Sequence, residues 1–372
     1  MSAKAPDRLT DARRRSGGFA LLMVLMLIAA ASVVGISYIY GSQIKTAGTN
    51  NLILASEARY LAESGLQHGL YGLQTGATPF GSAGAPNGRY HVVGGDGGYV
   101  FYIRATATPN DYQIVGMGTE EGISQTIAMT ARLTSDYAKK MNDLNPKHWW
   151  RLNDSGLTAV DEKEDKDGTY VNGVTRGVGG ALIGDLDTCA DFDGVNDYVQ
   201  LLEIEKVPGD KLTIGCWAKA DGWASAWPCL IARCIGTAGP NDQFFMLGMD
   251  PGRNLRFVLN VNNVGVDLRS AGKAVHIGEW FFAVATFNKN QQRMNLYKNG
   301  ELIASRITIL GGQVKDDDRL EVRIGDTPQG DPRRWRGPID EVFIIHETLS
   351  AEQIKELYDA RIPNVEVISW DD

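Results

Sequence analysis

The most informative absence in this chain is an absence of charge. No charged side chain lies between Arg15 and Lys45, although Asp, Glu, Lys and Arg make up 22% of the whole sequence. The apolar stretch from Phe19 to about Tyr40 is about 20 residues, enough for one helix to cross a bilayer. It is too long for a signal-peptide core, and no A-x-A cleavage site follows it. Because the arginines before it stay in the cytoplasm, we expect the rest of the chain to face outward.

The chain also lacks the patterns of common catalytic sites. Its five histidines show no ligand-type spacing, and no Ser/His/Asp arrangement or C-x-x-C pair is evident. A retaining glucanase needs two carboxylates about 5 Å apart on one face. The chain has no E-x-D-x-E strand, and the adjacent Asp340 and Glu341 would point to opposite strand faces. We therefore expect no catalytic residues and no enzyme. The formal net charge of −8 argues against nucleic acid as a partner.

Cysteine is scarce, and its four copies all lie between positions 189 and 234. An even number in an exported region allows disulfides, with three possible connectivities. Cys229 and Cys234 are close in sequence and lie in an expected loop, so we favour a Cys229–Cys234 bridge. Cys216 lies on an expected strand, where burial alone would explain it.

The apolar stretch follows a basic leader that ends in glycine. Arg13-Arg14-Arg15-Ser16-Gly17-Gly18 leads directly into Phe19. This pattern resembles the class III signal of type IV pilins and type II secretion pseudopilins. The resemblance implies a prepilin peptidase cut between Gly18 and Phe19, followed by methylation of Phe19. Most pilins carry glutamate five residues after the cut, whereas this chain has Met23. That difference argues against a major, filament-building subunit. The alternative is a single-pass anchor that is never cleaved.

The segment after the apolar stretch has helical periodicity. Between Ala47 and Leu73, apolar and small residues recur at i, i+3, i+4 and i+7. The run from Ala55 to Leu66 reads A-x-x-A-x-Y-x-A-E-x-G-L and resembles a signature of PilX- and MshP-like minor type IV pilins. We expect residues 1–18 to be a leader, and residues 19–74 to form one transmembrane and amphipathic helix.

A small sheet is predicted next. Residues 75–134 contain four short alternating runs separated by Gly, Pro, Asn and Asp turns, which is typical of an antiparallel meander. A lone small sheet buries too little apolar surface, so the preceding helix is its expected cover. Helix plus sheet is the α+β layout of a pilin headgroup. We expect residues 135–145 to be a linker.

Residues 146–363 predict an all-β jelly-roll sandwich, because short alternating strands and polar turns fill the segment. Six motifs in order resemble the LamG-like, concanavalin A-like jelly-roll family. Among them are Trp149 to Gly156, Phe192 to Val199, Gly278 to Phe287 and the Asn299-Gly300 hairpin turn. Residues 364–372 are then an expected tail.

Calcium is the metal that this segment suggests. The run from Asp161 to Gly168 is dense in carboxylates, and calcium takes six to eight oxygen ligands. In jelly rolls that this chain resembles, a structural calcium can lie between this early loop and a late I-D-E strand. The resemblance points to Asp161, Asp340 and Asp167 as metal ligands. The alternative is that the charge run is simply a solvated face.

Aromatic residues outside the family motifs suggest a ligand surface. Trp223 and Trp227 lie in a Gly/Ala/Ser/Pro loop, and Trp335 stands beside Arg334 in a basic run. Sugar faces stack on such rings, and arginine can bond hydroxyls or acidic groups. We therefore name Trp223, Trp227, Trp335 and Arg334 as candidate ligand-binding residues. The alternative is that these rings plug the ends of the sandwich core.

These patterns together predict a minor type IV pilin or pseudopilin that displays a lectin-like domain for surface adhesion or filament assembly. Its expected partners are other pilins, the prepilin peptidase and a glycan or extracellular protein. Its expected location is the inner membrane before assembly, then the periplasm or cell surface. An uncleaved membrane-anchored adhesion protein is the alternative, and a carbohydrate-active enzyme is a further one.

Overall fold

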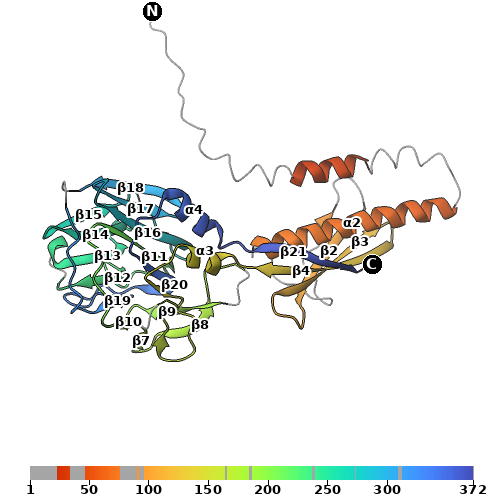
Figure 1. The fold of residues 1–372 in the computed structure, drawn as a ribbon. Helices are drawn as coiled ribbons and strands as arrows, with labels where there is room; N and C mark the ends of the chain where they lie inside the picture. Colours follow the sequence, from red (N-terminus) through yellow and green to blue (C-terminus); the bar gives the residue numbers. More distant parts are fainter. Residues whose placement is uncertain are drawn as a thin grey trace, which may run out of the picture. The chain divides into compact units, whose positions relative to one another are not determined.

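The computed structural model describes residues 23–33, 47–75, 90–91, 96–163, 166–183, 187–236, 239–272, 274–308 and 312–371. The chain forms two compact units (Figure 1). The first comprises Met1–Leu133 and Val365–Asp372, and the second comprises Thr134–Asn364.

The first unit contains a helix on an antiparallel meander. Residues 23–33 are helical, and α2 (Ala47–Thr75) follows. Residues 34–46 lie outside the described residues, so a single continuous helix over 19–74 stays a prediction. The sheet has the order β1-β2-β3-β4-β21 (Figure 1). Its strands are β1 (Tyr90–His91), β2 (Gly98–Ala105), β3 (Asp111–Glu120), β4 (Ile123–Thr134) and β21 (Asn364–Asp371).

Small residues let α2 approach the sheet closely. Ala62 and Leu66 on α2 are fully buried and pack with Phe101, Ile114 and other strand residues. Gly116 on β3 lies directly under the helix, since a Cβ there would come within 2.2 Å of the Ala62 carbonyl oxygen. The periodicity that predicted the helix therefore marks the face that covers the sheet, as expected.

The two segments that flank the jelly roll have structures that the sequence analysis did not predict. Residues 364–372, expected to be a tail, contribute β21 as the fifth strand of the first unit's sheet. The segment expected to be a linker contains α3 (Tyr137–Asp143), whose Tyr137 and Met141 are fully buried. The second unit is therefore inserted in the chain between β4 and β21. The local sequence pattern did not predict this insertion, because two strands that pair across a long sequence separation leave no local signal.

The second unit is an all-β sandwich of two eight-stranded sheets (Figure 1). One has the order β15 (Val264–Arg269), β14 (Leu255–Val261), β13 (Gln243–Met249), β12 (Cys229–Cys234), β19 (Val322–Ile324), β10 (Tyr198–Leu201), β7 (Gly168–Val171), β6 (Thr158–Ala159). The other has the order β18 (Glu301–Ile307), β17 (Arg293–Lys298), β16 (Trp280–Asn288), β11 (Lys211–Lys219), β20 (Arg336–Ile345), β9 (Thr188–Asp193), β8 (Thr175–Gly179), with β5 (His148–Trp150) paired to β20. The jelly-roll prediction is confirmed.

The two largest apolar clusters of the second unit account for most of its buried core. The larger one joins residues of both sheets, such as Phe257 and Ile214. The smaller one joins Trp217 and Phe282 to buried residues of α3 and of α4 (Ala351–Asp359). The helices thus cover an outer face of the second sheet, so both faces of β11 and β20 are buried over most of their length.

Candidate functional site

Two of the candidate tryptophans lie in a loop that the structure holds firmly. Residues 221–228 connect β11 to β12, and both Trp223 and Trp227 are half-buried. The Asp221 N–H donates to the Arg336 carbonyl (3.0 Å), and the Met249 N–H donates to the Pro228 carbonyl (2.8 Å). Since both ends of the loop are bonded to neighbouring strands, the two rings are held in place rather than left on a free tip.

Arginine side chains lie near both rings, one at Trp223 and three at Trp227. The Arg253 guanidinium lies 4.8 Å from the Trp223 ring centroid. Three guanidinium groups lie around Trp227, those of Arg256 (4.8 Å), Arg269 (5.3 Å) and Arg333 (5.8 Å). Cations at such distances are attracted by the electron-rich ring face. We call these six residues the Trp–Arg surface: Trp223, Trp227, Arg253, Arg256, Arg269 and Arg333.

Carboxylates orient two of these arginines. Asp267 accepts two hydrogen bonds from Arg256 (2.9 and 3.1 Å) and two from Arg269, one from its Nε (3.2 Å) and one from its Nη2 (2.7 Å). Burial alone would raise the pKa of Asp267, but the hydrogen bonds from Arg269 and Arg256 outweigh it and hold that pKa below its usual value. Burial lowers the pKa of Arg333. The surface therefore carries fixed, partly desolvated positive charge.

Sequence reasoning missed four of the six residues of the Trp–Arg surface. Arg256 and Arg269 pair directly across the β14–β15 hairpin, whose two turn residues Asn262 and Asn263 both have positive φ. An Asn-Asn pair at a two-residue turn is a readable hairpin signal. Counting outward from it would have placed the two arginines opposite each other. Their contact with Trp227 depends on tertiary structure and has no such signal.

The other two predicted ligand-binding residues lie elsewhere. Trp335 is 1% exposed, belongs to the core between the sheets and packs edge-on against Phe281. The prediction of a surface ring at Trp335 is therefore wrong, and the alternative that aromatics plug the core holds there. Arg334 is half-buried, and its Nε lies 3.8 Å from Asp326 Oδ2. The basic run gave a wrong prediction for Trp335, because the side chains of neighbouring residues alternate between core and solvent.

The structure does not bring the three predicted calcium ligands together. Asp161 accepts hydrogen bonds from the Trp149 N–H (2.9 Å) and pairs with His148 Nδ1 (2.7 Å). Asp167 accepts from the Asp161 N–H (2.9 Å). Asp340 lies in a different network, where it accepts from the Ala181 N–H (2.8 Å). Within the described ranges no group of three or more His, Cys, Asp or Glu side chains could hold a metal. The set as predicted therefore does not fit, and calcium binding stays a prediction.

Asp340 belongs instead to a buried acidic cluster around Arg151. Asp340 and Glu341 are both fully buried, and Glu341 accepts from Arg151 Nε (3.0 Å) and from the Trp149 indole. Arg151 also pairs with Asp187. Burial raises the pKa of Asp340 to about 8, and burial with the neighbouring Asp340 raises that of Glu341. This is a structural network inside the second unit.

A β-bulge explains why adjacent carboxylates share this network. Trp217 pairs with Asp340, whereas Gly215 pairs with Phe343, so β20 has an extra residue there. Glu341 has a φ of 54°, and a bulge re-aims side chains in this way. The expectation that Asp340 and Glu341 point apart is therefore wrong, because it assumed a regular strand.

The predicted disulfide is also wrong. Cys229 and Cys234 stand at the two ends of β12, and all four cysteines are free and buried. Residues five apart on a strand are about 16 Å apart, whereas a disulfide needs Cα atoms within about 7 Å. Burial raises the pKa of all four thiols. The pair was expected in a loop, and its place on a central strand excludes the bridge.

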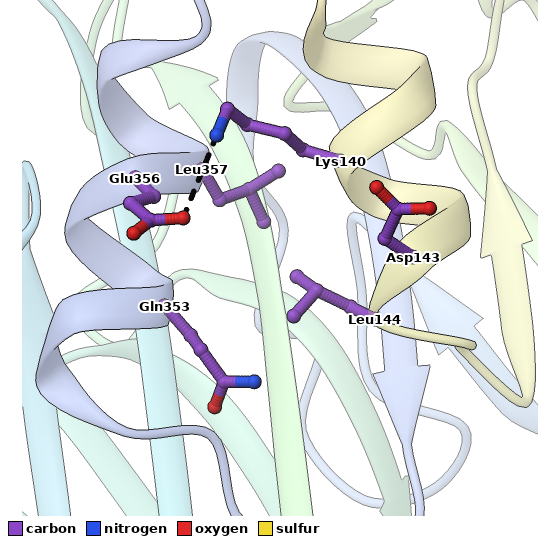
Figure 2. A pocket seen from close by; sticks show the side chains of 6 residues that line it. All are labelled: Lys140, Asp143, Leu144, Gln353, Glu356 and Leu357. Atoms are coloured by element: carbon purple, nitrogen blue, oxygen red, sulfur yellow. Dashed lines mark hydrogen bonds and ion pairs between the residues drawn. The ribbon is translucent and has the colours of Figure 1, made fainter.

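One pocket of the second unit lies between α3 and α4 (Figure 2). Lys140 on α3 and Glu356 on α4 form an ion pair across it, with Nζ and Oε2 3.5 Å apart. Both side chains are exposed, and such pairs contribute little. None of the predicted site residues lines this pocket, so it is not our candidate site.

The processing residues Gly18 and Phe19 lie outside the described residues. Of the predicted membrane span, residues 23–33 are described, and they are helical. Among the helices in the described ranges, none is long and apolar enough to cross a membrane.

Comparison with known proteins identifies the class of the larger part of the second unit. Residues 193–355 match the concanavalin A-like lectin/glucanases superfamily. This part of the chain is therefore a concanavalin A-like, LamG-like jelly-roll domain. No curated protein matches the chain.

Solved structures that are similar to part of this chain include binding domains of botulinum neurotoxins. The serotype D binding domain has 17% identity and a TM-score of 0.45, covering 60% of this chain and 53% of that one. The binding domain of neurotoxin DC, solved in complex with rat synaptotagmin II, has 16% identity and a TM-score of 0.44, covering 59% and 52%. The match thus spans about half the length of these domains.

Proposed function

We propose that this chain is a minor type IV pilin or pseudopilin whose jelly-roll domain binds a glycan at the Trp–Arg surface. The observation that carries the binding role is Trp227, a half-buried ring that three guanidinium groups surround. An aromatic ring offers an apolar face to a sugar, while arginine N–H groups donate to its hydroxyls. Trp223, in the same loop as Trp227, lies beside the exposed Arg253 of the turn between β13 and β14.

The pilin role rests on two features of the first part of the chain. Gly18 and Phe19 follow a basic leader and precede an apolar stretch, as in a class III signal. In addition, α2 covers the β2–β3 part of an antiparallel meander. The proposed partners are other pilins and the prepilin peptidase. The proposed location is the inner membrane before assembly and then the periplasm or cell surface. The alternative is an uncleaved membrane-anchored adhesion protein with the same jelly-roll ligand.

Co-expression with a prepilin peptidase tests the pilin role. We expect intact-mass analysis to give a chain that starts at methylated Phe19, and a Gly18→Leu variant to stay uncut. An uncut wild-type chain, beside a pilin that the same peptidase processes, would contradict the pilin role and leave the anchored adhesion protein.

Replacing Trp227 with alanine tests the binding role. We expect the affinity for any glycan that the chain binds to fall about 30-fold or more, because a central tryptophan typically contributes about 2 kcal/mol or more. Binding to an immobilised glycan panel measures this loss. Trp370→Ala is the control, since Trp370 is an exposed tryptophan (58%) on β21 of the first unit. Equal losses in both variants would contradict the proposed surface, and conversion of a glycan to products would favour an enzyme.

A further inference from the structure

The first unit's sheet ends in a long strand with an unpaired edge. β21 lies at one end of this sheet, beside β4, and within the described part of the chain no strand pairs with its other edge. The strand at the opposite end, β1, has two residues, whereas β21 has eight. Alternate residues of an edge strand turn their N–H and C=O groups away from the sheet. β21 therefore offers a row of backbone donors and acceptors to a further strand.

The side chains of β21 make this edge apolar. Val367, Ile368 and Trp370 are 37%, 45% and 58% exposed, and the strand contains no lysine and no proline. Natural sheets usually protect an edge with such residues, with a very short strand or with a covering helix. Of the residues of β21, Val365 packs against the apolar core under α2. A long apolar edge of this kind is suited to pairing with a strand of another chain.

Geometry restricts how β21 can pair with the β21 of a second copy. In an antiparallel pair, two directly opposite residues turn their N–H and C=O groups either both toward each other or both away. Across a two-fold axis, opposite residues must therefore both have even numbers or both have odd numbers. The longest registers that satisfy this rule are centred on Val367, which pairs residues 364–370 with themselves, or on Ile368, which pairs residues 365–371 with themselves.

Both of these registers keep the acidic side chains of β21 apart. With the centre at Val367, Glu366 lies opposite Ile368, and with the centre at Ile368 it lies opposite Trp370. Asp371 lies outside the first register and opposite an apolar residue in the second. A shift of the centre to Glu366 would place this carboxylate opposite its own copy, and like charges directly opposite destabilise a sheet. The charges of β21 are therefore compatible with a second copy of the same strand in its two longest registers.

We propose that two copies of this chain dimerise through β21, whose two copies pair antiparallel across a two-fold axis. One continuous sheet then passes through both first units, and the backbone groups at the edge of β21 gain hydrogen-bond partners. Because both copies use the same edge, the contact is closed and does not propagate into a fibre. This interface belongs to the first unit, so it is independent of the proposed glycan binding by the second.

Site-specific cross-linking of the full chain, in a non-ionic detergent, tests this proposal. Val367→Cys and Ile368→Cys each add one exposed thiol, since all four native cysteines are buried. Directly opposite residues have Cα atoms about 5 Å apart, within the reach of a disulfide of about 7 Å. The two copies of the other position are displaced by about 7 Å along the strands. Under mild oxidation we therefore expect the central position to cross-link about 10-fold or more faster than the other.

Thr126→Cys is the matched control, because Thr126 is exposed on β4, which lies between β3 and β21 in the same sheet. We expect this thiol to cross-link only by random collision. Analytical ultracentrifugation measures the association itself. A double variant, Val367→Asp with Ile368→Asp, places like charges opposite each other in either register and should weaken dimerisation about 10-fold or more. Thr126→Asp is the control for that variant.

The expected result is a rapid cross-link at position 367 or 368, background cross-linking at position 126, and weaker association of the double aspartate variant. A wild-type chain that sediments as a monomer would overturn the proposal. Equal cross-linking rates at all three positions would overturn it as well, since they would indicate collision without a fixed register. A dimer that the double aspartate variant leaves unchanged would place the contact on another surface and also overturn the role of β21.

Discussion

Replacing Arg151 with methionine should lower the free energy of unfolding of the second unit by about 3–5 kcal/mol at pH 8, the usual effect of removing one partner from a buried ion pair. Arg151 bonds Glu341 and pairs with Asp187, and Asp340 lies beside them. Without the guanidinium, these carboxylates would keep their burial and lose their partner. Methionine preserves most of the side-chain volume, so packing is the smaller change.

The loss should depend on pH in a definite direction. Burial raises the pKa of Asp340 to about 8 and raises that of Glu341, whereas both groups titrate near 4 when unfolded. The folded state therefore binds more protons between about pH 4 and 8, and stability falls as pH rises through that window. Arg151 lowers the pKa of both Asp340 and Glu341, so in the Arg151→Met variant both pKa values rise further and stability should fall more steeply than that of the wild type.

Urea unfolding of both proteins at pH 5 and pH 8 measures this difference. Arg176→Met is the control: Arg176 lies 5.4 Å from the Tyr170 ring centroid, as Arg151 lies 5.4 Å from that of Trp149, and its Nη1 donates to the Val174 carbonyl. A loss in Arg151→Met that is the same at both pH values, or no greater than that of Arg176→Met, would contradict the role of Arg151 as the counter-charge of this cluster.

Replacing Gly118 with alanine should destabilise the first unit by about 3 kcal/mol, at the upper end of typical overpacking costs. A Cβ at Gly118 would lie 2.0 Å from the Ala58 carbonyl oxygen and 2.5 Å from the Ala62 nitrogen. Both are backbone atoms of α2, so no side-chain rotation relieves the clash. The helix would have to move away from the sheet and leave part of its apolar face exposed.

Hydrogen exchange of the α2 amides measures this loss, because it reports on the helix without requiring the second unit to unfold. Gly156→Ala is the control, since no atom lies within 4 Å of a Cβ at that position in the second unit. Unchanged protection of α2 in Gly118→Ala would mean that the helix packs on the sheet less closely than the structure indicates.

The sequence by itself determined the local structure of this protein. Helical periodicity located the α2 face with Ala62 and Leu66, and alternation with polar turns predicted the antiparallel meander of the first unit and the sandwich of the second. Asn299 and Gly300 both have positive φ, as the predicted type I′ turn requires. Such features depend on neighbours within a few residues, so sequence pattern contains them.

Only the tertiary structure decided which distant residues meet. It placed Trp335 in the core, separated Cys229 from Cys234 along one strand, and joined the C-terminal residues to the first unit's sheet. It also brought Arg256, Arg269 and Arg333 to Trp227, although the first two are predictable as a cross-strand pair. The physical reason is that burial, register and charge pairing depend on contacts across the whole fold, and one chain's local pattern does not specify them.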